Sequence, residues 1–208
     1  PVITEVANRI AYTMSNIAAP RDRPRLAAWI RSTFGPPLAA IGVTPKPGDN
    51  DEVHSRRAAL ISLVGATAGD NAVRIEARAL AERYFGDRES LPGTLVPTVL
   101  RLAAQSGDTA LYERFLERAR ALTAEPEEHY RYLNTLSSFP GETLMERTLT
   151  IALSPEIRSQ DVANLTRGTI ARADVRGKAW SIVKARWPQF LAKLDSFQGL
   201  RGVVGTVG

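Results

Sequence analysis

The stretch "AQSGDTALYERFLERARAL", residues 104–122, decides the fold class of this chain. Its apolar side chains recur every three or four residues along one side, and most of its charged side chains lie on the other. This period is typical of an amphipathic helix that packs one face against a core. Asp108 stands where an N-cap side chain accepts a backbone N–H, and Gly107 before it is expected to let the chain reverse sharply. The stretch therefore predicts a tight turn followed by a helix.

The same glycine punctuation recurs along the chain. It appears at Gly69-Asp70, Gly107-Asp108 and Gly141-Glu142, with a looser copy at Gly177-Lys178, and the intervals between the glycines are 38, 34 and 36 residues. Near-constant intervals of this size are typical of stacked helical hairpins. A second helical segment precedes each glycine, and these segments are residues 58–66, 95–104, 130–136 and 162–171. Each predicted unit is therefore a helix, a tight turn and a second helix.

The pattern of the whole chain favours an all-α fold. No window alternates apolar and polar residues with the β-branched side chains that strands prefer. One helical hairpin cannot cover its own apolar faces, so successive hairpins are expected to stack. The sequence therefore predicts a right-handed α-α superhelix, a solenoid of antiparallel hairpins like those of HEAT and armadillo repeats.

We expect residues 1–208 to form a single helical-repeat domain cut from a larger polypeptide. Residues 1–48 are predicted to be leading helices, residues 49–197 about four helical hairpins, and residues 198–208 a truncated tail. The chain begins with Pro1 instead of methionine, and its glycine-rich end lacks the polar capping unit that normally closes a solenoid.

Prolines and tryptophans add local predictions. Gly35-Pro36-Pro37 is expected to interrupt the helix of residues 23–42, because proline removes a donor and ends or bends a helix. Pro188 is expected to kink a helix or to start a new one. Trp180 and Trp187 fall at helical spacing, and we interpret them as core side chains more readily than as a ligand platform.

Composition and net charge limit the classes of function that the chain can have. The chain is 44% hydrophobic and 24% charged, as expected of a globular protein, and its net charge is +5. A basic surplus can indicate a nucleic-acid or membrane partner. The chain has no long basic run and no apolar run that could cross a bilayer, so we expect no nucleic-acid partner and no membrane span. The absence of cysteine fits a reducing compartment such as the cytoplasm, but leaves the compartment open.

Motifs for catalysis and metal binding are missing from the sequence. The two histidines, His54 and His129, belong to no His-Glu-x-x-His helix, and there is no G-x-S-x-G elbow or phosphate-binding glycine loop. His129 follows Glu127 and Glu128 at an expected helix start, where it is interpreted as a solvated side chain. The sequence therefore predicts no catalytic residue, no metal ligand and no cofactor for this chain alone.

One long segment carries a family resemblance. "LSPEIRSQDVANLTRGTIARADVRGKAWSIVKARWPQF", residues 153–190, resembles a segment near the end of zinc aminopeptidases of the aminopeptidase N and puromycin-sensitive aminopeptidase family. The matching residues are Arg158-Ser159-Gln160-Asp161, Gly177, Ala179-Trp180 and Trp187. Residues 133–153 and 39–70 are similar to the preceding hairpin and to the start of the family's repeats, although Val43 stands where the family often has tryptophan.

The resemblance implies an accessory role. In this family a helical C-terminal domain, as in the endoplasmic-reticulum aminopeptidases, packs over a catalytic domain and walls off an internal chamber that peptides must enter. The zinc ligands and the general base lie in that catalytic domain, and none of their motifs occurs here. The implied partners of this chain are the catalytic domain of the same polypeptide and peptide substrates. The parent would be a zinc aminopeptidase that releases N-terminal residues.

Basic residues in the last third of the chain are the candidate peptide-binding groups. Between residues 158 and 201, Lys and Arg outnumber the acids nine to three. Cations on the concave face of a solenoid would favour the carboxylate end of a peptide or its acidic side chains. The candidates are Arg167, Arg172, Arg176 and Lys178. The alternative interpretation is that they are solvated, or pair with acids of neighbouring hairpins or of the rest of the polypeptide.

Two other classes of function stay open at this point. The chain could be a free-standing α-solenoid scaffold that binds partner proteins, or a basic helical-repeat protein that binds nucleic acid. Nucleic-acid binding would weaken steeply as salt is added.

Overall fold

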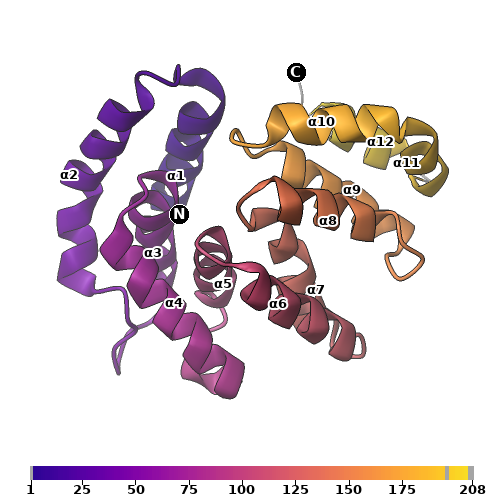
Figure 1. Cartoon of the computed structure of the whole chain (residues 1–208). Coiled ribbons are helices and arrows are strands. Elements are labelled where there is room, and N and C mark those ends of the chain that lie inside the picture. The colour runs from indigo at the N-terminus through magenta and orange to yellow at the C-terminus, as the bar shows by residue number, and fades with distance from the viewer. Residues whose placement is uncertain (1, 195–196, 206–208) are drawn as a thin grey trace. The chain divides into compact units, whose positions relative to one another are not determined.

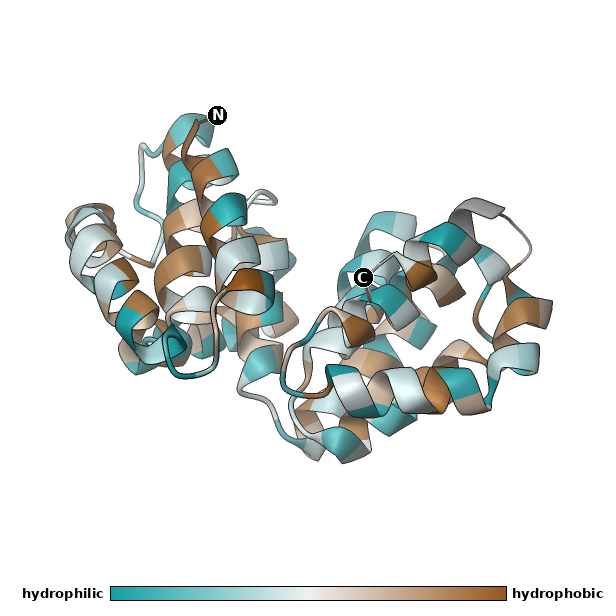
Figure 2. Ribbon diagram, turned by 90° about the horizontal axis from the view of Figure 1, so that it is seen from above, coloured by the Kyte–Doolittle hydropathy of each residue, from teal (hydrophilic) through white to brown (hydrophobic). Residues whose placement is uncertain are grey.

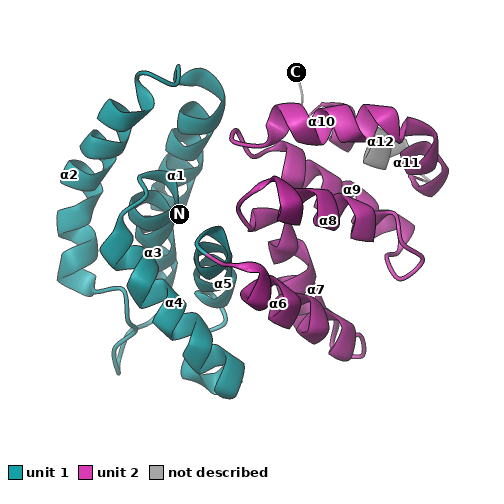
Figure 3. Cartoon of the chain, viewed as in Figure 1, with its two compact units in different colours: residues 1–106 teal, residues 107–208 magenta. Residues whose placement is uncertain are grey.

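The computed structural model describes residues 2–194 and 197–205, and every regular element in these ranges is a helix (Figure 1). The predicted all-α class is therefore confirmed. The chain forms two compact units, Pro1–Ser106 and Gly107–Gly208 (Figure 3). Each unit is described by itself below. The stacking of all hairpins into one solenoid domain remains a prediction.

Unit 1 contains five α-helices and three short helical segments. They are α1 (Val2–Tyr12), the π-helical η1 (Thr13–Ile17), α2 (Arg23–Ile41), α3 (Asp51–Ile61), the π-helical η2 (Ser62–Thr67), α4 (Asn71–Gly86), the 3-10 helix η3 (Arg88–Ser90) and α5 (Val96–Gln105). Along the helices, brown apolar residues are interspersed with teal polar ones (Figure 2). One buried cluster joins α1, η1, α2, α3 and η2, and its members are Ala7, Met14, Ile30, Ala59, Leu63 and Ala68.

The helix α2 runs through the two prolines that were expected to break it. It spans Arg23–Ile41 with Pro36 and Pro37 inside, so the predicted interruption is wrong. Proline nitrogens cannot donate to the carbonyls four residues earlier, those of Ser32 and Thr33. Both of these residues are exposed, so water can take the place of the missing donors.

Unit 2 contains the remaining helices among the described residues. They are α6 (Thr109–Ala121), α7 (Pro126–Thr135), the 3-10 helix η4 (Leu136–Ser138), α8 (Glu142–Ala152), α9 (Ser159–Ile170), α10 (Arg176–Ala185), α11 (Trp187–Lys193) and α12 (Phe197–Val204). No helix in the described part of either unit combines the length and the apolar composition needed to cross a membrane.

Four aromatic side chains form the centre of the core near the start of unit 2. Phe115 contacts the rings of Tyr132 and Phe139 edge to face, with centroids 5.6 and 5.3 Å apart, and Tyr112 contacts Phe139 at 5.1 Å. Edge-to-face pairs at these distances are favourable because the positive edge of one ring meets the negative face of the other. All four side chains are essentially inaccessible to solvent, so these contacts fix α6, α7 and η4 together.

The predicted caps are present, but the glycines before them act differently. Asp70 and Asp108 both cap their helices: Asp70 Oδ1 accepts the N–H of Val73 at 3.1 Å, and Asp108 Oδ1 accepts that of Leu111 at 2.9 Å. Gly69 has a φ of +70°, which favours glycine in a reversal.

Gly107 is required for packing instead of for a left-handed turn. A Cβ on Gly107 would lie 2.6 Å from the ring of Phe139, closer than side chains tolerate. Gly107 lies in the turn between α5 and α6 without the left-handed conformation that favours glycine, and its missing side chain makes room for the aromatic core.

The fourth glycine of the series is not a turn. Gly177 lies in the first turn of α10, and a Cβ there would meet nothing within 4 Å. The chain reverses earlier, between the end of α9 and the start of α10. A glycine near a helix start is tolerated without a structural need, so spacing alone could not distinguish it from a turn glycine.

Helices pair more closely across the long connectors than across the glycine turns. Within the units, the most extensive packing is between α4 and α5, between α6 and α7, and between α8 and α9. Contacts across the glycine turns, such as η2 with α4 and η4 with α8, are smaller. The Gly69 and Gly141 turns therefore join successive helix pairs, whereas the sequence pattern had placed them inside each pair.

The tryptophans near the end of unit 2 lie at the edge of its core. Trp180 and Trp187 are half-buried and contact each other edge to face, with centroids 6.5 Å apart. The fully buried side chains beside them are Val183 and Phe190. Pro188 is the second residue of α11, so it starts a new helix, one of the two outcomes predicted for it.

Candidate functional site

The four predicted cations lie around α9 and α10 of unit 2, but each has different neighbours. Arg167 is in the last turn of α9, and Arg172 lies in the connection that follows. Arg176 and Lys178 belong to the first turn of α10. We consider them in turn, because a cation that is held by the protein's own acceptors is less available to a ligand.

Arg172 fastens the connection between α9 and α10. Its Nη1 donates to the carbonyl oxygen of Phe139, and its Nε and Nη2 donate to the carboxylate of Asp174 at 3.3 and 2.5 Å. Only 17% of the side chain is exposed. Arg172 is thus held by a backbone carbonyl and by an acid two residues away, a partner that the sequence analysis did not anticipate.

Arg176 closes the end of α9. Its Nε donates to the carbonyl oxygen of Ile170 at 3.1 Å, and its Nη2 to that of Ala171 at 2.9 Å. The last carbonyls of a helix lack backbone donors and carry the negative end of its dipole, so a cation there is favourable. The guanidinium of Arg176 thus has a structural role as a C-terminal cap.

Lys178 and Arg167 are the more accessible members of the set. Lys178 Nζ lies 3.7 Å from Glu146 and 4.0 Å from Glu142, both on α8, and half of its side chain is exposed. Exposed ion pairs of this kind contribute little to stability. Arg167 is exposed, and both its Cδ and its guanidinium lie close to Gly202 of α12. Peptide binding by these side chains remains a prediction.

A polar recess lies between α7 and α9, and the sequence analysis did not predict it. It has a volume of about 190 Å³, and His129, Tyr130 and Asp161 line it. Burial raises the pKa of Asp161, which is 4% exposed, while His129, the Tyr130 hydroxyl 3.4 Å away and Arg158 oppose that rise. The segment Arg158-Ser159-Gln160-Asp161, prominent in the family resemblance, starts α9 at this recess.

His129 differs from its expected place in solvent. It is half-buried, its Nδ1 lies 2.7 Å from the carbonyl oxygen of Ala119, and its ring meets that of Tyr130 edge to face. The interpretation as a solvated histidine is therefore wrong. The sequence showed the acids at the helix start, but not the neighbouring helix α6 that covers the ring.

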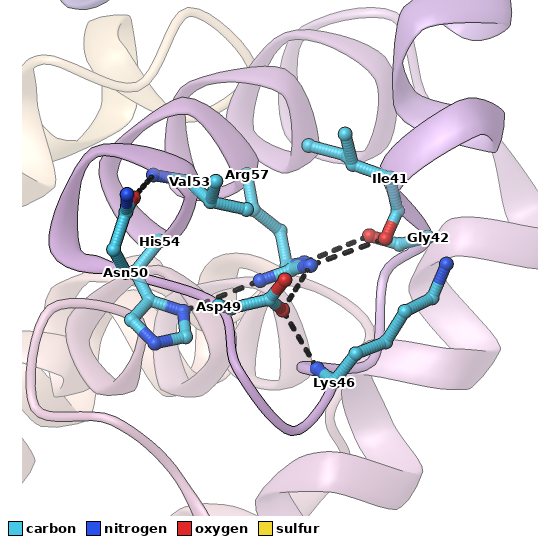
Figure 4. A network of polar contacts seen from close by, with 8 residues as sticks. All are labelled: Ile41, Gly42, Lys46, Asp49, Asn50, Val53, His54 and Arg57. Carbon is cyan, nitrogen blue, oxygen red and sulfur yellow. Dashed lines mark hydrogen bonds and ion pairs between the residues drawn. The ribbon is translucent and has the colours of Figure 1, made fainter.

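The most extensive polar network described in unit 1 surrounds Arg57 (Figure 4). Arg57 is completely buried on α3, and its guanidinium donates to the carbonyl oxygens of Gly42 at 2.9 Å and Ile41 at 3.1 Å. It also donates to Asp49 at 2.7 Å and contacts His54 Nδ1 at 3.2 Å. The end of α2, the loop of residues 42–50 and α3 are thereby joined at one side chain.

Asp49 completes the network on the loop side. Its carboxylate accepts the backbone N–H of Lys46 at 2.7 Å. This hydrogen bond, followed by the hydrogen bond and charge of Arg57, lowers the pKa of Asp49 below its ordinary value. Four of the five N–H donors of this buried guanidinium contact protein groups, and solvent does not reach the side chain, so we interpret this network as structural.

The described residues do not fit a zinc site. In residues 2–194 and 197–205, no three histidine, aspartate or glutamate side chains gather in a way that could hold a metal ion. Zinc in proteins needs three or four such ligands. We therefore assign no step of any reaction to a metal bound by these residues.

Comparison with known proteins agrees with this geometry. The whole chain, residues 1–208, matches the family described as the ERAP1-like C-terminal domain. It is 29% identical over 194 residues to aminopeptidase M1-A of Oryza sativa subsp. japonica, covering 89% of this chain and 21% of the relative. It is 28% identical over 175 residues to aminopeptidase M1-C of the same organism, covering 79% of this chain and 19% of that relative.

The chain thus spans about a fifth of the length of these relatives. The family match includes both compact units, and an all-helical structure agrees with the resemblance seen in residues 153–190. The chain belongs to the family of ERAP1-like C-terminal domains.

Proposed function

We propose that this domain encloses the active-site chamber of a zinc-dependent aminopeptidase and helps to admit and position its peptide substrates. The observation that carries the proposal is the family match over the whole chain, together with relatives that are named aminopeptidases and of whose length the chain matches about a fifth. The chemistry belongs to the rest of the polypeptide. This domain contributes walls and binding groups.

Two features of the described residues support a division of labour. The described side chains offer no cluster of metal ligands. The sequence carries no His-Glu-x-x-His motif either. Zinc and the general base are therefore assigned to the catalytic part of the parent polypeptide. We assign no catalytic residue to this chain.

An apolar surface on unit 1 supports a large covering partner. Val2 and Val6 are 81% and 37% exposed, and both line a cavity of about 530 Å³ beside α1 whose other apolar lining residues are Ile3 and Phe34. Grouped apolar exposure of this kind is typical of surfaces that are covered by another protein part. We propose the catalytic part of the same polypeptide as that partner. A free-standing scaffold would need a separate protein.

The proposal is tested in the full-length polypeptide with Arg167→Gln and Lys178→Gln combined. Both side chains are accessible, whereas Arg172 and Arg176 hold backbone carbonyls and would confound binding with folding. We expect KM for a ten-residue peptide to rise about two- to fivefold, the size expected for lost exposed ion pairs, with kcat unchanged. The KM for leucine p-nitroanilide should not change.

A matched control removes two other exposed cations, with Arg25→Gln and Lys184→Gln combined. It alters net charge by the same amount and should leave both KM values unchanged. Equal effects of the two double variants, or equal effects on peptide and single-residue substrate, would contradict the proposed role of Arg167 and Lys178.

A further inference from the structure

Helices of unit 1 converge on a polar recess. Its lining includes none of the four candidate cations of unit 2. It has a volume of about 280 Å³, slightly below the range of about 300–1,000 Å³ usual for drug-sized ligands, so it suits a small ligand. Its lining comes from α1, from α3 and η2, and from the segment that leads into α5. The polar side chains of the lining, besides Arg101, are Thr4, Asn8, Ser55, Ser62, Thr94 and Thr98.

The spacing of these residues explains why they meet. Thr4 and Asn8 are four residues apart on α1, and Ser55 and Ser62 are seven apart on α3 and η2, so each pair shares one helix face. Thr94, Thr98 and Arg101 follow the same spacing into α5. Three alanines fill the positions between them, and their small side chains leave the recess open.

Arg101 is the charged group of the recess. Its Nη2 donates to the hydroxyl oxygen of Ser62 at 2.7 Å. In the described part of the chain, no other protein acceptor bonds to this guanidinium and no carboxylate pairs with it. A guanidinium has five N–H donors, so four of them are available to a ligand or to water.

The guanidinium lies inside the recess while water still reaches the residue. Arg101 as a residue is exposed, yet desolvation by the surrounding protein lowers the pKa of its guanidinium from the ordinary value. An arginine remains charged at neutral pH even so. A charge that is partly desolvated and lacks a counter-ion binds an anion more strongly than a charge in open solvent does.

The hydroxyl groups around Arg101 are also available. Among the described residues, no hydrogen bond to another protein group engages the side chains of Thr4, Ser55, Thr94 or Thr98, nor that of Asn8. Hydroxyl and amide groups donate hydrogen bonds to oxyanions. The recess therefore presents one positive charge within a ring of uncharged donors.

The charge balance distinguishes between classes of anion. Arg101 is the one charged residue in the lining of this recess as described, so the recess neutralises one negative charge. A planar guanidinium also matches a carboxylate through two parallel hydrogen bonds. Phosphate at neutral pH carries more than one negative charge on average, roughly 1.5, so part of its charge would stay uncompensated.

We propose that this recess is a carboxylate-binding site in which Arg101 binds the carboxylate and the surrounding hydroxyl groups orient it. The site would accept either a free organic acid or the terminal carboxylate of a short peptide. The inference does not rest on the proposed function, since a free organic acid could bind here whether or not the domain contacts the substrates of a peptidase.

The test is calorimetric titration of the 208-residue chain at constant ionic strength with four probes. They are N-acetyl-Ala-Ala, its C-terminal amide, propionate and inorganic phosphate. We expect saturable binding of N-acetyl-Ala-Ala and no binding of the amide, because only the acid carries the charge. Propionate binding with equal affinity would identify a free organic acid as sufficient, and weaker propionate binding would identify the peptide terminus.

Variants connect the binding to the recess. Arg101→Gln should weaken N-acetyl-Ala-Ala binding at least about tenfold, as expected when charge-assisted hydrogen bonds are lost. Thr98→Val, which keeps the shape, should weaken it about two- to fivefold through the lost hydroxyl group. The control Arg78→Gln makes the same change of charge on α4 and should have no effect. Circular dichroism and thermal unfolding establish that each variant is folded.

Several results would overturn the proposal. Absence of saturable binding by the folded wild-type chain would do so, as would equal binding of the acid and its amide. Tighter binding of phosphate than of either carboxylate would assign the site to a different anion. Equal losses in Arg78→Gln and Arg101→Gln would show a general charge effect in place of a site.

Discussion

Arg57 and Arg101 are both arginines on helices of unit 1, yet their surroundings are opposite. Arg57 is completely buried, and its guanidinium contacts two carbonyl oxygens, the carboxylate of Asp49 and the ring of His54. Arg101 is exposed to solvent at a recess and donates to one hydroxyl oxygen, that of Ser62. The first holds three segments of the protein together. Arg101 has N–H donors that no described protein acceptor uses.

The difference separates a structural arginine from a binding arginine. Burying a charge is costly, so a buried guanidinium is stable only where protein acceptors replace water on every side. A guanidinium that is only partly desolvated bears less of that cost and need not be saturated by protein acceptors. The same reasoning applies in unit 2, where Arg172 and Arg176 are anchored to carbonyl oxygens and Lys178 and Arg167 are accessible.

The largest expected effect comes from making the same substitution at both arginines. Arg57→Gln should lower the free energy of unfolding by roughly 3–5 kcal/mol, because it leaves a carboxylate and two carbonyl groups without their donor. Arg101→Gln should change it by less than about 0.5 kcal/mol, as for most exposed substitutions. Urea unfolding of the 208-residue chain, followed by circular dichroism, measures both. Similar values for the two variants would remove the distinction between them.

A smaller effect on stability, confined to acid pH, tests the structural role of Arg57. The pKa of Asp49 is lowered by the N–H of Lys46 and by Arg57, so folding favours the ionised carboxylate. The stabilisation is fully present above the ordinary pKa of 3.8 and is lost as the pH falls through the lower folded-state value. The stability difference between the wild-type chain and Asp49→Asn should therefore shrink below about pH 4. The corresponding difference for Arg101→Gln should stay constant over that range.

Urea unfolding at several pH values below 5 measures this difference. A difference that stays constant or grows on acidification would show that Asp49 is not held as a carboxylate by the Arg57 network.

Local features of the fold could be predicted from the sequence. Asp70 and Asp108 cap their helices as expected, because an N-cap depends on a side chain and on backbone groups within three residues. The helical period could also be recognised, because apolar side chains recur every three or four residues along the face that a helix buries. The predicted interruption at Pro36 and Pro37 was wrong, because on a solvated helix face water can replace the N–H donors that proline lacks.

Features that depend on a neighbouring helix could not be predicted. Position 107 has room only for glycine, because Phe139, more than thirty residues later in the sequence, packs against it. The same applies to the sites. Arg56 and Arg57 are adjacent in the sequence, but only the structure shows that Arg57 is buried beneath the loop of residues 42–50 while Arg56 is exposed.

The binding groups show the same limit. The surplus of positive charge in the last third of the chain predicted four binding residues, Arg167, Arg172, Arg176 and Lys178. Two of these, Arg172 and Arg176, donate hydrogen bonds to backbone carbonyl oxygens instead. Arg101 lies in a stretch of ordinary helical composition. Its significance comes from α1 and α3, which bring hydroxyl groups to it and no carboxylate. A weak signal, the spacing of Thr94, Thr98 and Arg101 on one face, was present but is common among helices.

The central claim is that Arg101 is accessible with four donors for a ligand, whereas Arg57 is buried and four of its five donors contact protein groups. The most direct measurement is a titration of the 208-residue chain with N-acetyl-Ala-Ala, followed by the NMR signals of the arginine side-chain Nε–H groups. Arg57→Gln and Arg101→Gln assign the two signals. We predict a saturable shift of the Arg101 signal and none of the Arg57 signal. A stationary Arg101 signal, or equal movement of both, would contradict the account.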